Sequence, residues 1–227
     1  HESIRRNFLE EAYEAVEAID EQNPDHLKEE LGDVLLQVLF HARMEQEAGR
    51  FNLDDVADGV CKKLIYRHPH VFGDVSVSGT GEVLTNWEEL KRKEKGQATN
   101  TDALDAVARS LPALWRAEKV QKKAKKAGFD WPDISGALDK LSEELEELKT
   151  AVAEGTNVEE ELGDLLFSAV NVSRFLKVDP EVALGKATDK FIGRFSKVEA
   201  QAAAQNQSME GMTLEELDKL WEHAKET

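Results

Sequence analysis

The sequence lacks most features that mark secreted, membrane or nucleic-acid-binding proteins. Its 227 residues contain one cysteine, Cys61, so no disulfide framework can form within the chain, and a reducing cytoplasm fits best. The longest apolar run, around residues 34–40, is far too short to cross a bilayer, and no signal peptide is visible. The formal net charge is −17, which argues against binding to nucleic-acid phosphates. We therefore expect a cytoplasmic protein with neither a membrane nor a nucleic-acid partner.

Helical periodicity, in contrast, runs through almost the whole chain. Apolar residues recur every three or four positions over residues 2–20, and residues 25–48 continue as a helix that is apolar on nearly every side after Asp33. That pattern predicts an interior helix. Further helices are predicted at residues 53–67, 82–95, 110–128, 136–154, 157–176, 180–203 and 213–226.

No alternating pattern longer than "DVSVS", residues 74–78, indicates a strand. A polar linker, "KGQATNTD", separates the two halves of the chain at residues 95–102. We therefore expect an all-α protein made of two helical-bundle domains, residues 1–97 and 98–227.

Four short patterns occur twice, in the same order along the chain. Their offsets are 133, 131, 127 and 134 residues. Four ordered matches at nearly one offset indicate a duplicated unit rather than an accident of an acidic composition. The patterns are Glu-Glu-x-x-Glu from Glu10 and Glu143, Glu-Leu-Gly-Asp from Glu30 and Glu161, Lys-x-Ile-x-Arg from Lys63 and Lys190, and Trp-Glu-x-x-Lys from Trp87 and Trp221.

The two acidic patterns place carboxylates three residues apart on successive helices. On the first helix of each copy, the pair lies beside an apolar stripe, centred near Ala12 and Ile19 in the first copy and running from Leu138 to Val152 in the second. Two antiparallel helices would then bring four carboxylates together. The predicted ligand sets are Glu11, Glu14, Glu30 and Asp33 in the first copy and Glu144, Glu147, Glu161 and Asp164 in the second.

Carboxylates this close repel one another unless a cation lies among them, and hard oxygen ligands suit Mg²⁺, with Mn²⁺ as a substitute. Gly32 and Gly163, which weaken their helices, predict that a neighbouring backbone approaches closely there. A single glutamate pair on a helix is usually a solvated surface feature. Duplication of the whole constellation at matching helical positions favours a metal site.

Basic and aromatic residues follow each acidic set. Lys190 and Arg194 lie four residues apart on one helix face, where they could hold phosphate oxygens, although an ordinary basic surface has the same pattern. Trp221 could stack on a base or fill a core. Lys225, one turn after Trp221, and Lys91 in the first copy are candidate phosphate contacts.

These elements together resemble the MazG family of nucleoside triphosphate pyrophosphohydrolases. The segments "EELGDVLLQVLFHARMEQEAGRF", "RHPHVF" and "SLPALWRAEKVQKKAKKAGFDW" are similar to stretches of two-domain members, and the resemblance covers essentially the whole chain. It implies tandem all-α MazG domains, a homodimer, and Mg²⁺-dependent hydrolysis of NTPs or dNTPs to the monophosphate and pyrophosphate.

The resemblance also implies roles for individual residues. The second-copy carboxylates become the catalytic metal ligands, matched by those of the first copy, while Lys190 and Arg194 hold the triphosphate and Trp221 contacts the nucleotide. Two-domain relatives favour the C-terminal copy for catalysis, although both copies here keep all four carboxylates. Asn157 stands where some relatives carry a lysine, which puts one phosphate contact in doubt. Relatives also carry a Cys-Pro-Trp-Asp segment before the first helix, so we expect that an upstream segment is missing here.

Two other functions stay open at this stage. The first is a regulatory helical dimer that binds nucleotides or a partner protein without turnover. The second is a related hydrolase that acts on dUTP or phosphoribosyl-ATP. Product analysis separates the second from the main hypothesis, and loss of turnover on Glu144→Ala in a folded protein would exclude the first.

Overall fold

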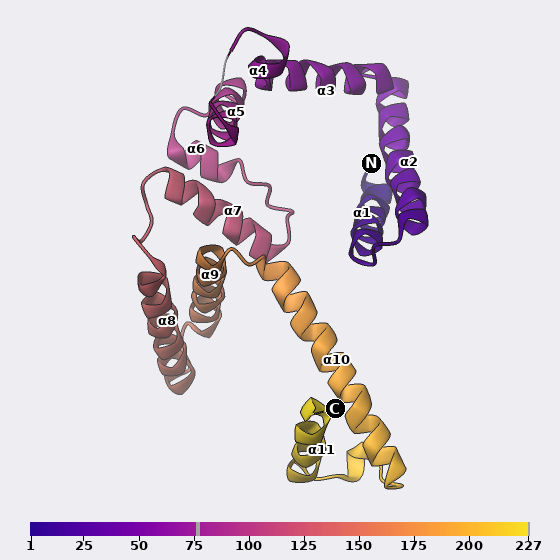
Figure 1. Ribbon diagram of the computed structural model, residues 1–227, viewed down its shortest axis with the longest axis vertical. Coiled ribbons are helices and arrows are strands. Elements are labelled where there is room, and N and C mark those ends of the chain that lie inside the picture. Colours follow the sequence, from indigo (N-terminus) through magenta and orange to yellow (C-terminus); the bar gives the residue numbers. More distant parts are fainter. Residues whose placement is uncertain (76–77, 227) are drawn as a thin grey trace. The chain divides into compact units, whose positions relative to one another are not determined.

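The computed structural model describes residues 1–75 and 78–226 as a chain of helices (Figure 1). No strand occurs among these residues, which confirms the all-α prediction. The chain divides into two compact units, His1–Gly96 and Gln97–Thr227. The division falls beside the predicted domain boundary, and the assignment of one repeat to each unit stays a prediction. Ser76 and Val77, within the "DVSVS" segment, lie outside the described residues.

The first unit begins with a two-helix hairpin. Residues 21–23 connect α1 to α2, and so short a link makes the two helices antiparallel neighbours. Asn23 caps α2 by accepting a hydrogen bond from the backbone N–H of His26 at 3.2 Å, and Pro24 occupies the first helical position. The elements of this unit are η1 (Glu2–Ile4), α1 (Arg5–Asp20), α2 (Pro24–Glu47), α3 (Leu53–Arg67), α4 (Pro69–Phe72) and α5 (Thr80–Glu94).

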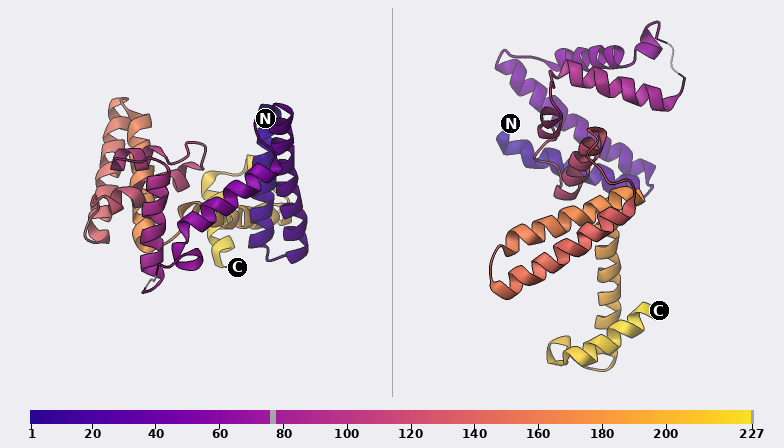
Figure 2. Two further views of the ribbon diagram at one scale, coloured as in Figure 1. Left: turned by 90° about the horizontal axis from the view of Figure 1, so that it is seen from above. Right: turned by 90° about the vertical axis from the view of Figure 1, so that its left-hand side faces the viewer.

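The second unit contains a matching hairpin, which Figure 2 shows as two helices side by side. Residues 155–157 connect α8 to α9, a link of the same length as in the first unit. Gly155 ends α8 in the left-handed conformation, with φ of 71°, which glycine adopts without strain. The elements are α6 (Asn100–Asp105), α7 (Ala113–Lys126), α8 (Ile134–Glu154), α9 (Val158–Leu176), α10 (Pro180–Ala204), η2 (Met209–Gly211) and α11 (Leu214–Glu226).

Two short helices lie in segments that the sequence pattern had marked as irregular. In the polar linker, Thr99 and Asp102 form a reciprocal capping box that starts α6. In the segment after α3, Pro69 occupies the first position of α4, a single helical turn. Both helices are too short to show a hydrophobic period, so only their capping residues could have predicted them.

The hairpins pack through small residues, and this corrects the predicted apolar stripes. In α1 the buried residues are Ala15 and Ala18, whereas Ile19 is 56% exposed. In α8, Ala137 and Ala151 are buried, and the larger apolar residues Leu138 and Val152 are exposed. Small side chains let two helices approach closely, so the alanine face forms the contact and the larger residues lie on the flanks.

The prediction that α2 is an interior helix is wrong for the single chain. Leu31, Leu35 and Phe40 are 54%, 56% and 47% exposed, because α1 covers only one side of this helix. The predicted close approach at the helix glycines is also wrong, since a Cβ built at Gly32 or Gly163 meets nothing within 4 Å. Around the exposed residues of α2 and at both glycines, the described helices of each unit leave the helix surface open.

A small core closes the C-terminal end of the second unit. Val198 and Ala202 of α10 pack against Leu220 and Ala224 of α11, and Trp221 lies at the edge of this cluster. No helix of the described chain is long and apolar enough to span a membrane.

Candidate metal centre and phosphate-binding groups

The hairpin of the first unit brings three of its four predicted carboxylates together. Glu11 and Glu14 come from α1 and Glu30 from α2, and one oxygen of each lies within 4.8 Å of the others. Glu30 is buried, with 8% of its surface exposed. Asp33, the fourth predicted ligand, lies one turn further along α2 and is not part of this cluster.

The hairpin of the second unit also brings three predicted carboxylates together, but the predicted ligand that lies outside this cluster is on the first helix of the hairpin. Glu144 of α8 meets Glu161 and Asp164 of α9, again with oxygens within 4.8 Å of one another. Glu144 is the most buried of the three, at 4% exposure. Glu147 is exposed and lies outside the cluster, although its carboxylate is close enough to be affected by the charge of Glu144.

The electrostatics of both clusters favour a bound cation. Desolvation and the negative charges of Glu30 and Glu11 raise the pKa of Glu14. Desolvation and the negative charge of Glu144 likewise raise the pKa of Glu147. A raised carboxyl pKa means that the ionised form is disfavoured where it stands, and a divalent cation would relieve that repulsion.

The donor set also fits a hard divalent metal. Every candidate ligand is a carboxylate oxygen, the type that Mg²⁺ and Mn²⁺ prefer. The Oε2 atom of Glu30 is buried and has no hydrogen-bond partner among the described residues. A buried carboxylate oxygen without a partner is costly, so this atom is suited to a metal ion or to an ordered water molecule.

Neighbours of the two clusters differ, and the sequence reading missed them. In the first unit, His26 lies 3.2 Å from Glu30, and the Gln37 side chain donates a hydrogen bond to Glu11 at 3.3 Å. In the second unit, the ammonium of Lys140 lies 2.6 Å from Glu144 and also pairs with Glu143. Hydrogen bonds to these two carboxylates raise the pKa of Lys140.

A spacing rule could have found two of these three neighbours. His26 precedes Glu30 by four residues, and Lys140 precedes Glu144 by four, the separation at which side chains meet on a helix. Gln37 contacts Glu11 across the hairpin, so only the packing of α1 on α2 reveals it.

The basic residues of the repeated patterns differ between the two units in their burial and in their contacts. In the first unit, Arg67 is buried and donates a hydrogen bond to Glu94 at 2.7 Å, while Lys91 lies 4.7 Å from the ring centre of Trp87. In the second unit, Lys190 is exposed and Arg194 is half-buried. Within the described part of the chain, neither Lys190 nor Arg194 forms an ion pair with a carboxylate.

The tryptophans also have different surroundings. Trp221 is half-buried, with its ring centre 5.1 Å from that of Phe191, so it packs against both α10 and the small C-terminal core. Lys225 pairs with Glu222 on the same helix. Thus the structure gathers the carboxylates of each hairpin, and no ion pair among the described residues joins them to Lys190, Arg194 or Lys225.

Comparison with known proteins links this geometry to one family. The family model described as the MazG nucleotide pyrophosphohydrolase domain matches residues 1–72 and 134–199, which together exceed half of the chain. Both matched segments contain one acidic hairpin.

Individual relatives match over nearly the whole chain. This protein is similar to the nucleoside triphosphate pyrophosphohydrolase/pyrophosphatase MazG of Thermotoga maritima, with 48% identity over 99% of this chain and 86% of the relative. It is also similar to the nucleoside triphosphate pyrophosphohydrolase of Escherichia coli K12, with 45% identity over 96% of this chain and 84% of the relative. A third relative, the uncharacterized protein YabN of Bacillus subtilis, is 49% identical over the full chain, which spans 47% of that protein.

Proposed function

This chain belongs to the MazG family and is a nucleoside triphosphate pyrophosphohydrolase, and we propose that its second unit performs the reaction with Mg²⁺. The observation that carries the proposal is the cluster of Glu144, Glu161 and Asp164 on the α8–α9 hairpin. The basic pair on α10 supports the choice of this unit, because Lys190 and Arg194 are not engaged by a carboxylate in the described chain.

Mg²⁺ is the metal we assign to these carboxylates. Glu144, Glu161 and Asp164 would hold it, with Glu147 as a further ligand close by, and their oxygen donors match its preference. When bound, the ion would offset the negative charge of the triphosphate and orient it. In the first unit the corresponding ligands are Glu11, Glu14 and Glu30, with Asp33 as the fourth.

The side chains of the second unit then have separate tasks. Lys190 and Arg194 bind the phosphates and stabilise negative charge on the departing pyrophosphate, with the arginine able to donate two parallel hydrogen bonds. A carboxylate of the cluster accepts a hydrogen bond from the attacking water and takes its proton. Water attacks the α-phosphorus, the bond from that atom to the bridging oxygen breaks, and the pyrophosphate leaves.

Nucleotide recognition is assigned to the C-terminal helix. Trp221 presents a ring that could stack on a base, and Lys225 lies one turn away as a phosphate contact. Lys91, which holds the matching position beside Trp87, would serve a nucleotide in the first unit. The substrates of the proposed reaction are NTPs and dNTPs.

A homodimer is part of the proposal. Large apolar side chains lie exposed along both hairpins, including Leu35 and Leu39 on α2 and Leu162 and Leu166 on α9. A monomer with this much exposed apolar surface would be poorly stable in water, and a second copy of the chain can cover it symmetrically. The carboxylates and the basic pair of the second unit also lie on separate helices, so packing of a partner could complete each site.

The dimer is tested by measuring molar mass in solution with light scattering. Wild type is expected at about twice the chain mass of 25.4 kDa. Leu166→Glu should shift it toward monomer, whereas Lys149→Glu, at an exposed polar position on α8, should not. A monomeric wild type would contradict this part of the proposal.

The reaction itself is tested by product analysis. Wild type with Mg²⁺ should convert a panel of NTPs and dNTPs to monophosphate and pyrophosphate, and chelation of divalent metal should stop it. In ¹⁸O-labelled water the label should appear in the monophosphate, because water attacks the α-phosphorus. Release of inorganic phosphate with a diphosphate product, or label in the pyrophosphate, would contradict the assignment. A cytoplasmic location remains the expectation that goes with this nucleotide chemistry.

A further inference from the structure

In the first unit, a carboxylate contacts the arginine of the Lys-x-Ile-x-Arg pattern. Arg67 matches Arg194 in the repeated Lys-x-Ile-x-Arg pattern. Both its Nε and its Nη2 atoms lie 2.7 Å from Oε2 of Glu94, and the Arg67 side chain is only 9% exposed. The guanidinium carbon also lies 5.3 Å from the ring centre of Trp87. Thus two neighbours from α5 fix the arginine of α3.

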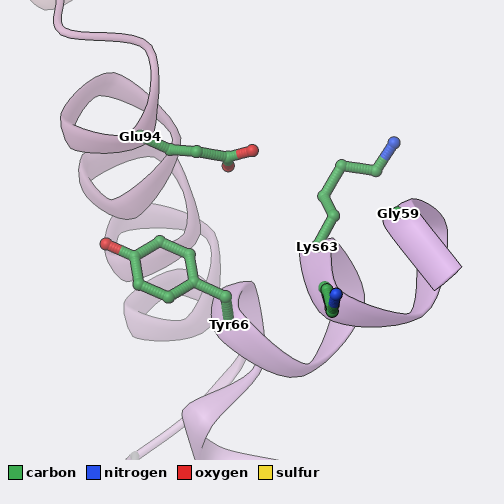
Figure 3. Close-up of a pocket in the computed structure, with 5 residues that line it drawn as sticks. Gly59, Lys63, Tyr66 and Glu94 are labelled. Atoms are coloured by element: carbon green, nitrogen blue, oxygen red, sulfur yellow. The ribbon is translucent and has the colours of Figure 1, made fainter. Parts of the chain in front are cut away.

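The Glu94 carboxylate occupies the position that a phosphate group would need. Carboxylate and phosphate oxygens accept hydrogen bonds from the same guanidinium N–H groups, and Glu94 Oε2 already accepts from two of them, so a phosphate would have to compete for this arginine. Glu94 is 37% exposed, and it lines an open cavity of about 260 Å³ together with Gly59, Lys63 and Tyr66. Figure 3 shows it projecting from α5 into the space beside α3, where Lys63 and Tyr66 lie.

The second unit shows no such engagement. Arg194 is half-buried on α10, and within the described residues no acidic side chain pairs with it. Its tryptophan, Trp221, packs on Phe191 instead of on the arginine. In the first unit the arginine of the pattern is therefore bound by a carboxylate of the protein. In the second unit the matching arginine is available to a ligand.

We propose that Glu94 is an internal competitor for phosphate, which keeps the basic pair of the first unit from binding the polyphosphate of a nucleotide. This inference rests on the proposed function, because it assigns Arg67 the ligand class proposed for Arg194. When the binding-competent state is only a small fraction of the population, apparent affinity falls by that fraction. Removal of the negative charge at position 94 should therefore release a latent polyphosphate site.

The test uses inorganic tripolyphosphate and calorimetry, so it does not depend on turnover. Lys190→Gln and Arg194→Gln are introduced together in the full chain to remove the phosphate contacts of the second unit. In this background Glu94→Gln should tighten tripolyphosphate binding by about tenfold. The amide of glutamine still accepts one hydrogen bond from Arg67, so the α3–α5 contact is retained, and circular dichroism checks the fold.

Two further variants make the result specific. Glu89→Gln removes the same charge from an exposed position on the same helix and should leave affinity unchanged. Adding Arg67→Gln to Glu94→Gln should abolish the gain. No gain with Glu94→Gln, an equal gain with Glu89→Gln, or a gain that survives loss of Arg67 would each overturn the inference. Failure of the proposed function has a separate signature, namely absence of pyrophosphate release by wild type.

Discussion

The two acidic hairpins have the same design and different surroundings. Each consists of two antiparallel helices joined by a three-residue link, and each gathers three carboxylates. In the first unit the cluster is in contact with a histidine and an amide, His26 and Gln37, while in the second it meets an ammonium, that of Lys140. The basic pair differs in the same way, since Glu94 engages Arg67 and no carboxylate of the described chain engages Arg194.

A duplicated motif therefore does not guarantee duplicated chemistry. The carboxylates needed to bind a metal are present in both units, so an account based on ligands alone would give both the same activity. On the proposal made above, the groups around those carboxylates decide whether a polyphosphate can bind beside them. Matched substitutions in the two units should therefore have unequal effects.

The largest inequality is expected between the two arginines. Arg194→Gln should lower kcat/KM for nucleotide hydrolysis by about 10²–10³-fold, because it removes charge-assisted hydrogen bonds to the phosphates. Arg67→Gln should change kcat/KM by less than about threefold, since that guanidinium already donates hydrogen bonds to Glu94. Steady-state kinetics with one nucleotide measure both variants, and equal losses of kcat/KM would contradict the proposed difference between the two arginines.

A second inequality concerns stability and involves another matched pair of arginines. Arg174 is buried and donates hydrogen bonds to Asp130, whereas its counterpart in the first unit, Arg43, pairs with Glu47 on the surface. Asp130→Asn should lower the free energy of unfolding by about 3 kcal/mol, because it leaves a buried cation uncompensated. Glu47→Gln should cost less than about 0.5 kcal/mol. Urea unfolding measures both, and a larger cost for Glu47→Gln would contradict this account.

The ion pair of Arg174 with Asp130 also predicts that the stability of the protein depends on pH. Hydrogen bonds from Arg174 lower the pKa of Asp130 below its usual value of 3.8. A carboxyl whose pKa is lowered by folding stabilises the protein above its unfolded pKa, and this contribution is lost as pH falls through the folded pKa. Wild type should therefore lose more stability than Asp130→Asn when pH is lowered from about 5 to about 2. Parallel losses in the two proteins would show that Asp130 is not responsible.

The smallest effect is expected at the lysine beside the second cluster. The Lys140 ammonium forms an ion pair with Glu144, so it would compete with the proposed metal ion for that carboxylate. Lys140→Met should lower the Mg²⁺ concentration for half-maximal binding by about threefold, corresponding to less than 1 kcal/mol. Calorimetric titration measures it without substrate. Lys149→Met, at a lysine that pairs only with exposed Glu146 in the described chain, is the control, and an equal shift there would refute a local effect.

Much of this comparison could be predicted from the sequence, because the helices and the acidic motifs are local features. The periodicity placed the long helices, and the i, i+3 spacing put Glu161 and Asp164 on one face, where the structure has them together. The predicted apolar stripe is wrong at Ile19, because a contact between two helices selects small residues such as Ala15 and Ala18 and not the most hydrophobic ones.

Contacts between segments far apart in the chain could not be predicted from the sequence. Glu94 follows Arg67 by 27 residues and meets it only because α5 packs on α3. Gln37 reaches Glu11 across the first hairpin for the same kind of reason. The apolar character of α2 predicted burial within one chain, yet Leu35 is 56% exposed in the described chain, and the proposed dimer would cover it.

One paired measurement decides whether the second unit performs the reaction. Pyrophosphate release from a nucleotide with saturating Mg²⁺ is compared for wild type, Glu161→Gln and Glu30→Gln, which neutralise matching ligands of the two clusters. Glu161→Gln should lower the rate by at least about a hundredfold, while Glu30→Gln should retain most of it. A rate that survives Glu161→Gln and falls with Glu30→Gln would place the chemistry in the first unit and contradict the account.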